Sequence, residues 1–203
     1  GQDVYRTATA VDGVGKAWVF WTAKNDGVWN LFARCLTGNR WSATRQITNT
    51  PTPDIFPVAT TDKDGRVWVA WQAFGKTNSG ICAARQEGDA FSKAIVVADT
   101  PGNEWTPAIA ASKDGQVAVA WDTYAKGDYD VYCSVASDGK FGAPVPIATT
   151  SGAEMRPSVA YDTSHRLWIA YESGPALWGK DSGALERQGQ GLYKVRTVAI
   201  RVL

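Results

Sequence analysis

The most constraining feature of the sequence is a short apolar stretch that returns every 50 residues. It is Arg66–Trp71 in the second copy, and its counterparts are Lys16–Trp21, Gln116–Trp121 and Arg166–Tyr171. No gap is needed to align them, and a fixed period of this length is typical of an array of similar supersecondary units. The sequence therefore predicts four repeats, at about residues 1–50, 51–100, 101–150 and 151–203.

Each repeat is expected to hold four short strands, A to D. In the second copy these are Phe56–Thr61, Arg66–Gln72, Gly80–Gln86 and Ala94–Ala98. The A–B and C–D connections are short and rich in Asp and Gly, residues that tolerate left-handed backbone angles. The pattern therefore predicts an all-β unit built from tight hairpins.

Strand B is apolar on both of its faces. Val67, Val69 and Trp71 point one way, while Trp68 and Ala70 point the other way. Such a strand must be covered on both sides, which a ring of four-stranded sheets packed face to face achieves. We therefore expect a β-propeller in which each repeat is one blade. A β-sandwich or a solenoid is the structural alternative, but a sandwich would show polar outward positions in alternation.

The fourth repeat departs from the pattern. It carries a long insertion over 172–191, and the strand that begins at Leu192 runs on to Leu203 without a C–D turn. The last blade is therefore expected to be incomplete. We interpret residues 1–203 as one propeller domain, or as part of a larger ring completed by a second copy or by residues outside this sequence.

Composition excludes several classes of function. The net charge is +1, with 21 basic and 20 acidic residues well mixed, so no footprint for nucleic acid is present. No apolar run of about 18 residues is available for membrane insertion. The 3 Cys fall on different repeats and there is 1 His, so we expect free thiols, no metal site and no cofactor. The start at Gly1 shows no leader, which leaves the compartment open, with a periplasmic or secreted location slightly favoured.

Topology separates the two rims of the predicted propeller. The A–B and C–D turns lie together on one rim, which we call the regular rim because its turns are short in every repeat. The B–C and D–A loops lie on the other, which we call the loop rim. Its loops differ between repeats, at 23–29, 73–79, 123–130 and the insertion. Variable loops on a rigid scaffold are where binding usually resides, so the loop rim is the predicted binding face.

Two sets of residues on the loop rim are candidate ligand contacts. The first is a carboxylate that recurs every 50 residues, at Asp54, Glu104 and Glu154. These acids would either ring the channel mouth and bind a ligand, or accept hydrogen bonds in their own turns, and the second role is preferred because every copy shares it. The second set is aromatic and offers flat faces for sugar rings. Its members are Trp105, Tyr124 and Trp178.

The repeats resemble those of bacterial β-propellers of the TolB-like and sialidase-like kind. The resemblance rests on Pro-x-(Val/Ile)-Ala, then Asp-Gly, then Trp-(Val/Ile)-Ala-Trp, over nearly the whole chain. The sialidase Asp-box is nearly matched by Asp62–Trp68, but with one extra residue and between strands A and B rather than C and D. The arginine triad of sialidase chemistry is not found, so no catalytic residue is assigned from the resemblance.

We predict from these observations a non-catalytic binding module that uses the loop rim, with a glycan or a protein as its partner. The first alternative is a glycan-processing hydrolase or lyase in which rim carboxylates such as Glu104 and Glu154 act as general acid and base. The second is an architectural propeller that assembles through its incomplete last blade, with a homo-oligomer completing the ring.

Overall fold

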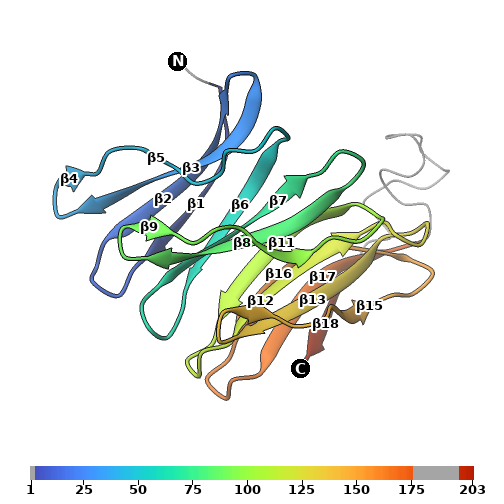
Figure 1. The fold of residues 1–203 in the computed structure, drawn as a ribbon. Coiled ribbons are helices and arrows are strands. Elements are labelled where there is room, and N and C mark those ends of the chain that lie inside the picture. Colours follow the sequence, from blue (N-terminus) through green and yellow to red (C-terminus); the bar gives the residue numbers. More distant parts are fainter. Residues whose placement is uncertain (1–2, 176–196) are drawn as a thin grey trace.

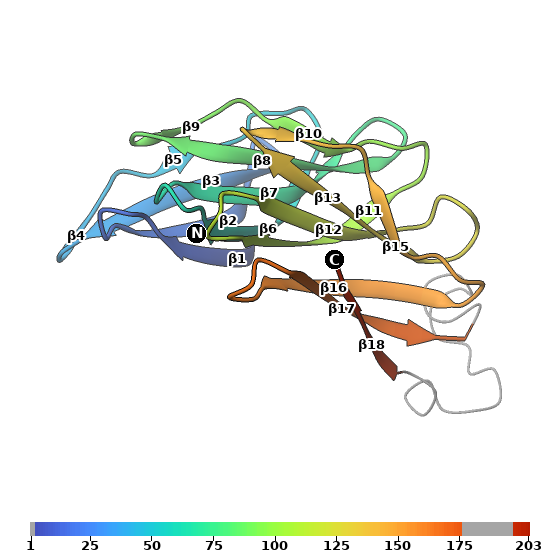
Figure 2. The same ribbon diagram turned by 90° about the horizontal axis from the view of Figure 1, so that it is seen from below.

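The computed structural model describes residues 3–175 and 197–203 and shows a β-propeller. Its strands form separate antiparallel sheets, one for each repeat, which lie side by side (Figures 1 and 2). Blade 1 contains β1 (Val4–Val11), β2 (Ala17–Asn25), β3 (Val28–Thr37), β4 (Arg40–Trp41) and β5 (Arg45–Gln46). Blade 2 contains β6 (Asp54–Thr61), β7 (Val67–Phe74), β8 (Ser79–Glu87), β9 (Ala90–Phe91) and β10 (Ile95–Ala98). Blade 3 contains β11 (Glu104–Ala111), β12 (Val117–Thr123), β13 (Asp130–Ser137), β14 (Lys140–Phe141) and β15 (Val145–Ala148). Blade 4 contains β16 (Ala153–Tyr161), β17 (Leu167–Gly174) and β18 (Thr197–Val202).

The predicted strands are confirmed, with one difference at the outer edge of blades 1, 2 and 3. Strand D is split into two short pieces that both pair with strand C, as β9 and β10 pair with β8 in blade 2. Within the described residues blade 4 has strands A, B and C, since β18 pairs with β17 in the place of strand C. Of the insertion predicted over 172–191, residues 172–174 belong to β17, and 176–191 lie outside the described residues, as does the predicted start of the last strand at Leu192.

The hydrophobic core lies between neighbouring sheets, as the two-faced strand B requires. Trp18 and Phe20 of β2 pack against Val67, Val69 and Trp71 of β7 at the junction of blades 1 and 2. The next two junctions repeat this arrangement, with the matching faces of β7 against β12 and of β12 against β17. The inner strands contact one another in the order β1, β6, β11, β16. Each blade is therefore stabilised by burying its faces against its neighbours.

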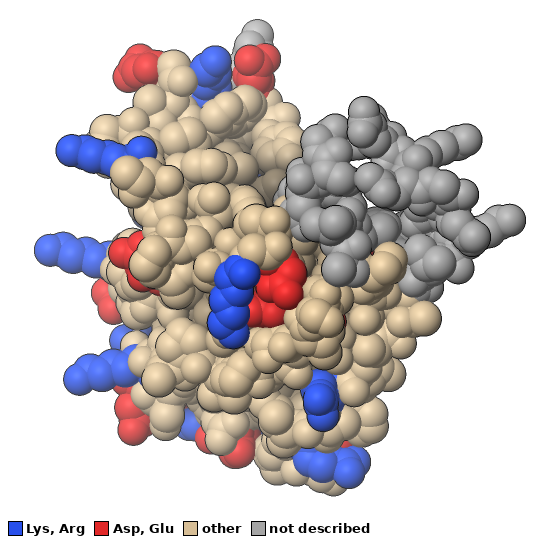
Figure 3. Space-filling model, turned by 90° about the vertical axis from the view of Figure 1, so that its right-hand side faces the viewer, with Lys and Arg blue, Asp and Glu red and all other residues tan. Residues whose placement is uncertain are grey.

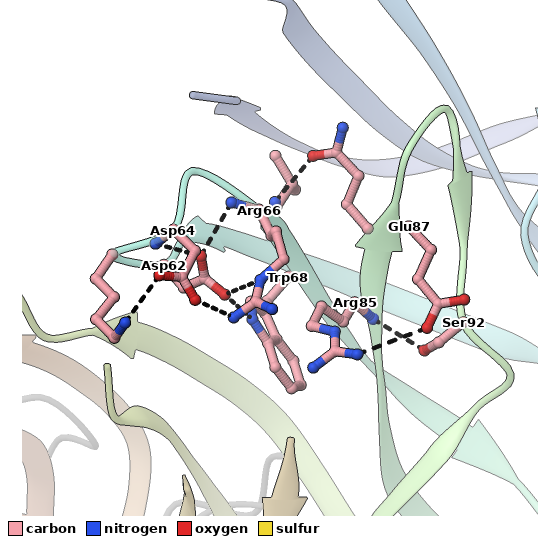
Figure 4. A network of polar contacts seen from close by, with 10 residues as sticks. Asp62, Asp64, Arg66, Trp68, Arg85, Glu87 and Ser92 are labelled. Carbon is pink, nitrogen blue, oxygen red and sulfur yellow. Dashed lines mark hydrogen bonds and ion pairs between the residues drawn. The ribbon is translucent and has the colours of Figure 1, made fainter. Parts of the chain in front are cut away.

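An aspartate fixes the A–B turn of blades 1, 2 and 4. In blade 2, Asp62 Oδ1 accepts the backbone N–H groups of Asp64 and Arg66, both at 2.9 Å. Its Oδ2 accepts the indole N–H of Trp68 at 2.9 Å (Figure 4). Asp12 and Asp162 hold Trp18 and Trp168 in the same way, at 3.0 and 2.8 Å. In blade 3 both members of this pair differ: Ser112 stands in the place of the aspartate and Ala118 in the place of the tryptophan. The near match to an Asp-box therefore has a physical basis, because the acid is both the turn acceptor and the partner of the tryptophan.

A bulge interrupts each inner strand close to the loop rim. The register of β11 with β12 shifts between Trp105 and Ala108, and Thr106 takes a φ of 50°. The same shift occurs in all four repeats, with a positive φ of 50° to 57°. The bulged residues are Arg6, Phe56, Thr106 and Arg156. Bulges bend the strand and change the direction of its side chains, so the bulge determines which residues reach the loop rim.

The two rims are separated as expected. The A–B and C–D turns gather at the lower left of Figure 1, and the B–C and D–A loops gather at the upper right. On the regular rim the A–B turns of blades 1 and 2 touch through their backbones, where Gly13 N–H donates to the Gly65 carbonyl at 2.8 Å. A Cβ on Gly65 would lie 2.5 Å from Gly13 Cα, so this close approach requires glycine.

The three cysteines are free thiols, and burial raises the pKa of Cys82 and Cys133 to about 12. In the described part of the chain, no group of three or more His, Cys, Asp or Glu side chains is arranged to hold a metal ion. Over the same residues, the model contains no helix with the length and apolar character needed to cross a bilayer.

Candidate functional site on the loop rim

An aromatic cluster lies on the loop rim where blades 3 and 4 meet. The Trp105 and Tyr129 rings are 5.6 Å apart, and Tyr124 lies 5.0 Å from Tyr129. Tyr129 is buried and packs with Met155 of blade 4, whereas Trp105 and Tyr124 are half-buried. The buried ring thus supports two rings that reach the surface, which is the geometry of a platform for an apolar face such as that of a sugar.

A chain of polar contacts runs across the same junction. Asp122 of β12 is buried, and its Oδ2 accepts the backbone N–H of Arg156, the bulged residue of β16, at 2.7 Å. The Arg156 guanidinium reaches Glu172 of β17 at 3.2 Å. The Glu172 side chain is 31% exposed, so this carboxylate has access to solvent. Figure 3 shows the loop rim as a surface, with acidic atoms near its middle and a basic side chain beside them.

The predicted carboxylates Asp54 and Glu154 are buried acceptors at two different blade junctions. Asp54 accepts the indole N–H of Trp71 at 2.9 Å and the hydroxyl of Thr50 at 2.6 Å. Glu154 accepts the backbone N–H of Thr150 at 3.1 Å and its hydroxyl at 2.5 Å. Since both acids are at most 3% exposed, neither is placed to meet a substrate directly.

Glu104 differs from its two counterparts. Its Oε1 accepts the hydroxyl of Thr100, but its Oε2 forms no hydrogen bond of normal geometry. Thr123 lies opposite it on β12, and the Thr123 hydroxyl is likewise buried without such a partner. Burial, opposed by the Thr100 hydrogen bonds, raises the pKa of Glu104 to about 7. Glu104 is thus a buried acid that holds its proton near neutral pH.

The structure brings together some of the predicted site residues and separates others. Trp105, Tyr124 and Glu154 share the junction of blades 3 and 4. Glu104 lies on the other face of β11, where its carbonyl accepts the Ser79 hydroxyl of blade 2. Asp54 belongs to the junction of blades 1 and 2, and Trp178 lies outside the described residues.

Sequence reasoning missed the polar chain of Asp122, Arg156 and Glu172. A signal was present, because the position occupied by Asp122 and Glu172 reads Thr22 and Gln72 in the first two repeats. An acid thus appears there in blades 3 and 4 alone. The role of Arg156 had no such signal, because it depends on the bulge that turns its backbone N–H toward Asp122.

A second aromatic cluster occupies the loop rim at blades 1 and 2. Tyr5 lies 5.5 Å from Phe56 and 6.1 Å from Trp29. The Arg6 guanidinium lies over the Phe56 ring at 4.6 Å. The loop rim therefore carries aromatic surface at both ends of the described blades.

The regular rim contains a cavity of about 730 Å³ between blades 1 and 2. Its charged groups pair with one another, as Lys16 does with Asp89 at 2.6 Å and Arg85 with Glu87 at 3.6 Å. Figure 4 shows the neighbouring network, in which Asp62 lies between Arg66 and Trp68. We place the candidate site on the loop rim despite this cavity, because the cavity is lined by turn residues whose charges are already compensated.

Several solved structures similar to this chain are enzymes that act on glycans. An α-L-arabinanase of Penicillium chrysogenum bound to arabinobiose aligns with 98% of this chain and 62% of its own, at a TM-score of 0.64 and 12% identity. A thermostable family-43 glycoside hydrolase aligns with 98% of this chain and 71% of its own, at 0.58 and 14%. The Hadza microbial sialidase Hz136 aligns with 83% of this chain and 42% of its own, at 0.58 and 14%. No protein-family model and no characterised sequence matches the chain. At these identities the likeness establishes the propeller fold.

These comparisons correct two sequence predictions. The chain was expected to be a non-catalytic binding module and not an enzyme, but the similar structures are glycoside hydrolases. They favour the alternative, a glycan-processing enzyme. The pair first considered as its acid and base, Glu104 and Glu154, is also revised, because both side chains are at most 1% exposed. The polar groups of the regular rim do not point to catalysis. Glu172, the acid of the polar chain that reaches solvent, lies at a position whose residue changes between repeats.

Proposed function

We propose that this chain forms the catalytic propeller of a glycan-processing hydrolase, acting on the loop rim at the junction of blades 3 and 4. The observation that carries the proposal is a carboxylate with solvent access, Glu172 of blade 4, on the same rim as the half-exposed rings of Trp105 and Tyr124. It is linked through Arg156 to Asp122 at the junction of blades 3 and 4. Glycoside hydrolysis needs carboxylates beside a sugar-binding surface, and this junction supplies both.

The residues of the polar chain have distinct roles in this proposal. Glu172 transfers the proton, because it is the member whose side chain meets solvent. Asp122 is as buried as Asp54 and Glu154, so it is a positioning residue that fixes the backbone of Arg156 and, through it, Glu172. Arg156 orients Glu172 through its guanidinium and is itself fixed by the hydrogen bond from its backbone N–H to Asp122. Trp105 stacks on the sugar.

The similar structures support a choice of substrates to test. The propeller of Penicillium chrysogenum is an α-L-arabinanase solved with arabinobiose. We therefore propose arabinose-containing oligosaccharides as the substrates to test first, followed by other neutral glycans. The aromatic surface at blades 1 and 2 would extend contact with a longer glycan.

Hydrolysis assays on single carboxamide variants test the proposal. Glu172→Gln is expected to lower kcat by about 10²-fold to 10⁴-fold, the range that general acid–base catalysis contributes. Its affinity for arabinobiose, measured by calorimetry, should stay within a few-fold because the aromatic platform is intact. Glu87→Gln is the matched control, since Glu87 is an exposed acid on the regular rim. A wild-type chain that cleaves no glycan of the panel, or a Glu172→Gln variant that is fully active, would overturn the proposal.

A further inference from the structure

The end face of blade 4 is apolar and exposed. Cross-strand pairing places Trp168 opposite Val202 and Ala170 opposite Ile200, so these side chains share one face of the sheet. Trp168 is 38% exposed, Val202 43% and Ile200 58%. We call this surface the blade 4 end face. Contiguous apolar surface of this kind on a folded protein marks an interaction site.

The other blades show what fits such a face. The residues equivalent to Trp168 are Trp18 and Trp68, which are 0% and 2% exposed because the next blade covers them. In each case the covering strand presents alternate apolar residues, as β7 does with Val67, Val69 and Trp71. The internal junctions thus define the partner chemistry: a four-stranded sheet whose strand B carries this alternation.

One strand in the described part of the chain has this pattern and is not covered in the same way. It is β2, whose Ala17, Val19 and Trp21 stand at the positions of Val67, Val69 and Trp71. They are only partly buried, whereas Val69 is 0% exposed. Arg34 lies on the same face of blade 1, opposite Val19, but its Nε donates to the Ser42 carbonyl at 2.8 Å and its guanidinium lies over Trp41. These contacts direct the charge toward the outer edge of the blade.

We infer that the blade 4 end face binds the Ala17, Val19 and Trp21 face of blade 1 in a second copy of this chain. The contact is head-to-tail and repeats the geometry of the internal junctions. It joins two different surfaces, so an open assembly keeps one free face of each kind until a ring closes. The inference concerns assembly and does not depend on the proposed hydrolase activity.

Mass measurement of the wild-type chain and two arginine variants tests the inference. Light scattering after gel filtration should give at least twice 21.9 kDa for the wild type at high concentration, and the mass should fall on dilution. Ile200→Arg and Val19→Arg should each fall to the monomer mass. Val14→Arg is the matched control, because Val14 is 80% exposed in a turn of the regular rim, and this variant should keep the wild-type mass.

Mixing the two variants distinguishes head-to-tail pairing from a symmetric contact and shows that both are folded. Ile200→Arg keeps an intact blade 1 face and Val19→Arg keeps an intact blade 4 end face, so an equimolar mixture should form a 1:1 dimer that grows no further. Association of Val19→Arg alone would show that two blade 4 end faces meet each other, and would overturn the head-to-tail inference. A wild-type chain that stays monomeric at the highest concentrations would overturn the interface itself.

Discussion

The regular rim and the loop rim are built from the same four repeats, yet they differ in what the repeats hold in common. On the regular rim, Asp12, Asp62 and Asp162 make the same hydrogen bonds in the same turn. On the loop rim, one equivalent position holds Thr22, Gln72, Asp122 and Glu172. A contact repeated in blade after blade serves the scaffold, because each blade has the same structural need. A residue that changes while its backbone stays constant is free to take a chemical role.

The acidic residues of the loop rim fall into the same two groups, repeated and variable. Asp54, Glu104 and Glu154 repeat, and they are buried at the start of the inner strands. Asp122 and Glu172 do not resemble their counterparts in the first two blades, and Glu172 reaches solvent. Position on the rim is therefore a weaker guide to function than departure from the repeat.

Removing the repeated aspartate of blade 2 should produce the largest loss of stability. The Asp62 side chain is 3% exposed and accepts from two backbone N–H groups, the Trp68 indole and the Arg66 Nε. Asp62→Ala would leave these donors unpaired and is expected to cost about 3 kcal/mol in the free energy of unfolding, measured by urea denaturation. The kinetic parameters of the folded fraction should not change.

Asp64→Ala is the matched control for that experiment. Asp64 lies two residues away on the same turn, but its side chain is 43% exposed and its ion pairs with Lys63 and Arg66 are at the surface. The change in stability should be much smaller than for Asp62→Ala. Equal losses for the two variants would contradict the view that the buried acceptor, rather than the charge of the turn, holds the regular rim together.

Glu104 should make the stability of the protein depend on pH. Its pKa is raised from 4.5 to about 7 in the folded state, mainly by burial. Between these values the folded protein holds a proton that the unfolded chain has released. This contribution is therefore complete below pH 4.5 and is lost as the pH rises through 7. The expected fall is on the order of 2 kcal/mol.

Glu104→Gln should remove this fall, because the amide stays neutral at every pH. Urea denaturation of both proteins from pH 4 to pH 8 measures the difference between their slopes. Glu87→Gln, on the regular rim, should keep the wild-type slope. If Glu104→Gln also keeps the wild-type slope, the carboxyl of Glu104 is ionised in the folded protein at neutral pH. Glu104 would then resemble Asp54, whose two carboxylate oxygens both accept hydrogen bonds, more closely than its geometry indicates.

Much of the fold was predictable from the sequence, because the period of 50 residues and the two apolar faces of strand B leave few ways to bury Trp68 and Trp71. The division into two rims followed from topology alone. The bulges were only partly signalled by the sequence. Phe56, Thr106 and Arg156 each precede a proline, which a strand tolerates at a bulge, but Arg6 precedes Thr7 and none of the four is glycine. The site depends on them: the backbone N–H of Arg156 meets Asp122 only where the strand is bent. Half of the predicted ligand contacts, Trp105, Tyr124 and Glu154, do lie at one junction.

The smallest expected effect is on glycan affinity, through Trp105. Its ring is half-buried against Tyr129, so it presents one face to a sugar while the other is packed. Trp105→Ala should weaken binding of arabinobiose roughly tenfold, about 1.4 kcal/mol, with the loss measured by calorimetry. Trp105→Phe should recover part of it. Trp41→Ala is the control, since Trp41 is 49% exposed on β4 and lies away from the loop rim. A loss of affinity in Trp41→Ala equal to that in Trp105→Ala would remove the distinction between the rims, because aromatic exposure anywhere on the blades would then suffice for binding.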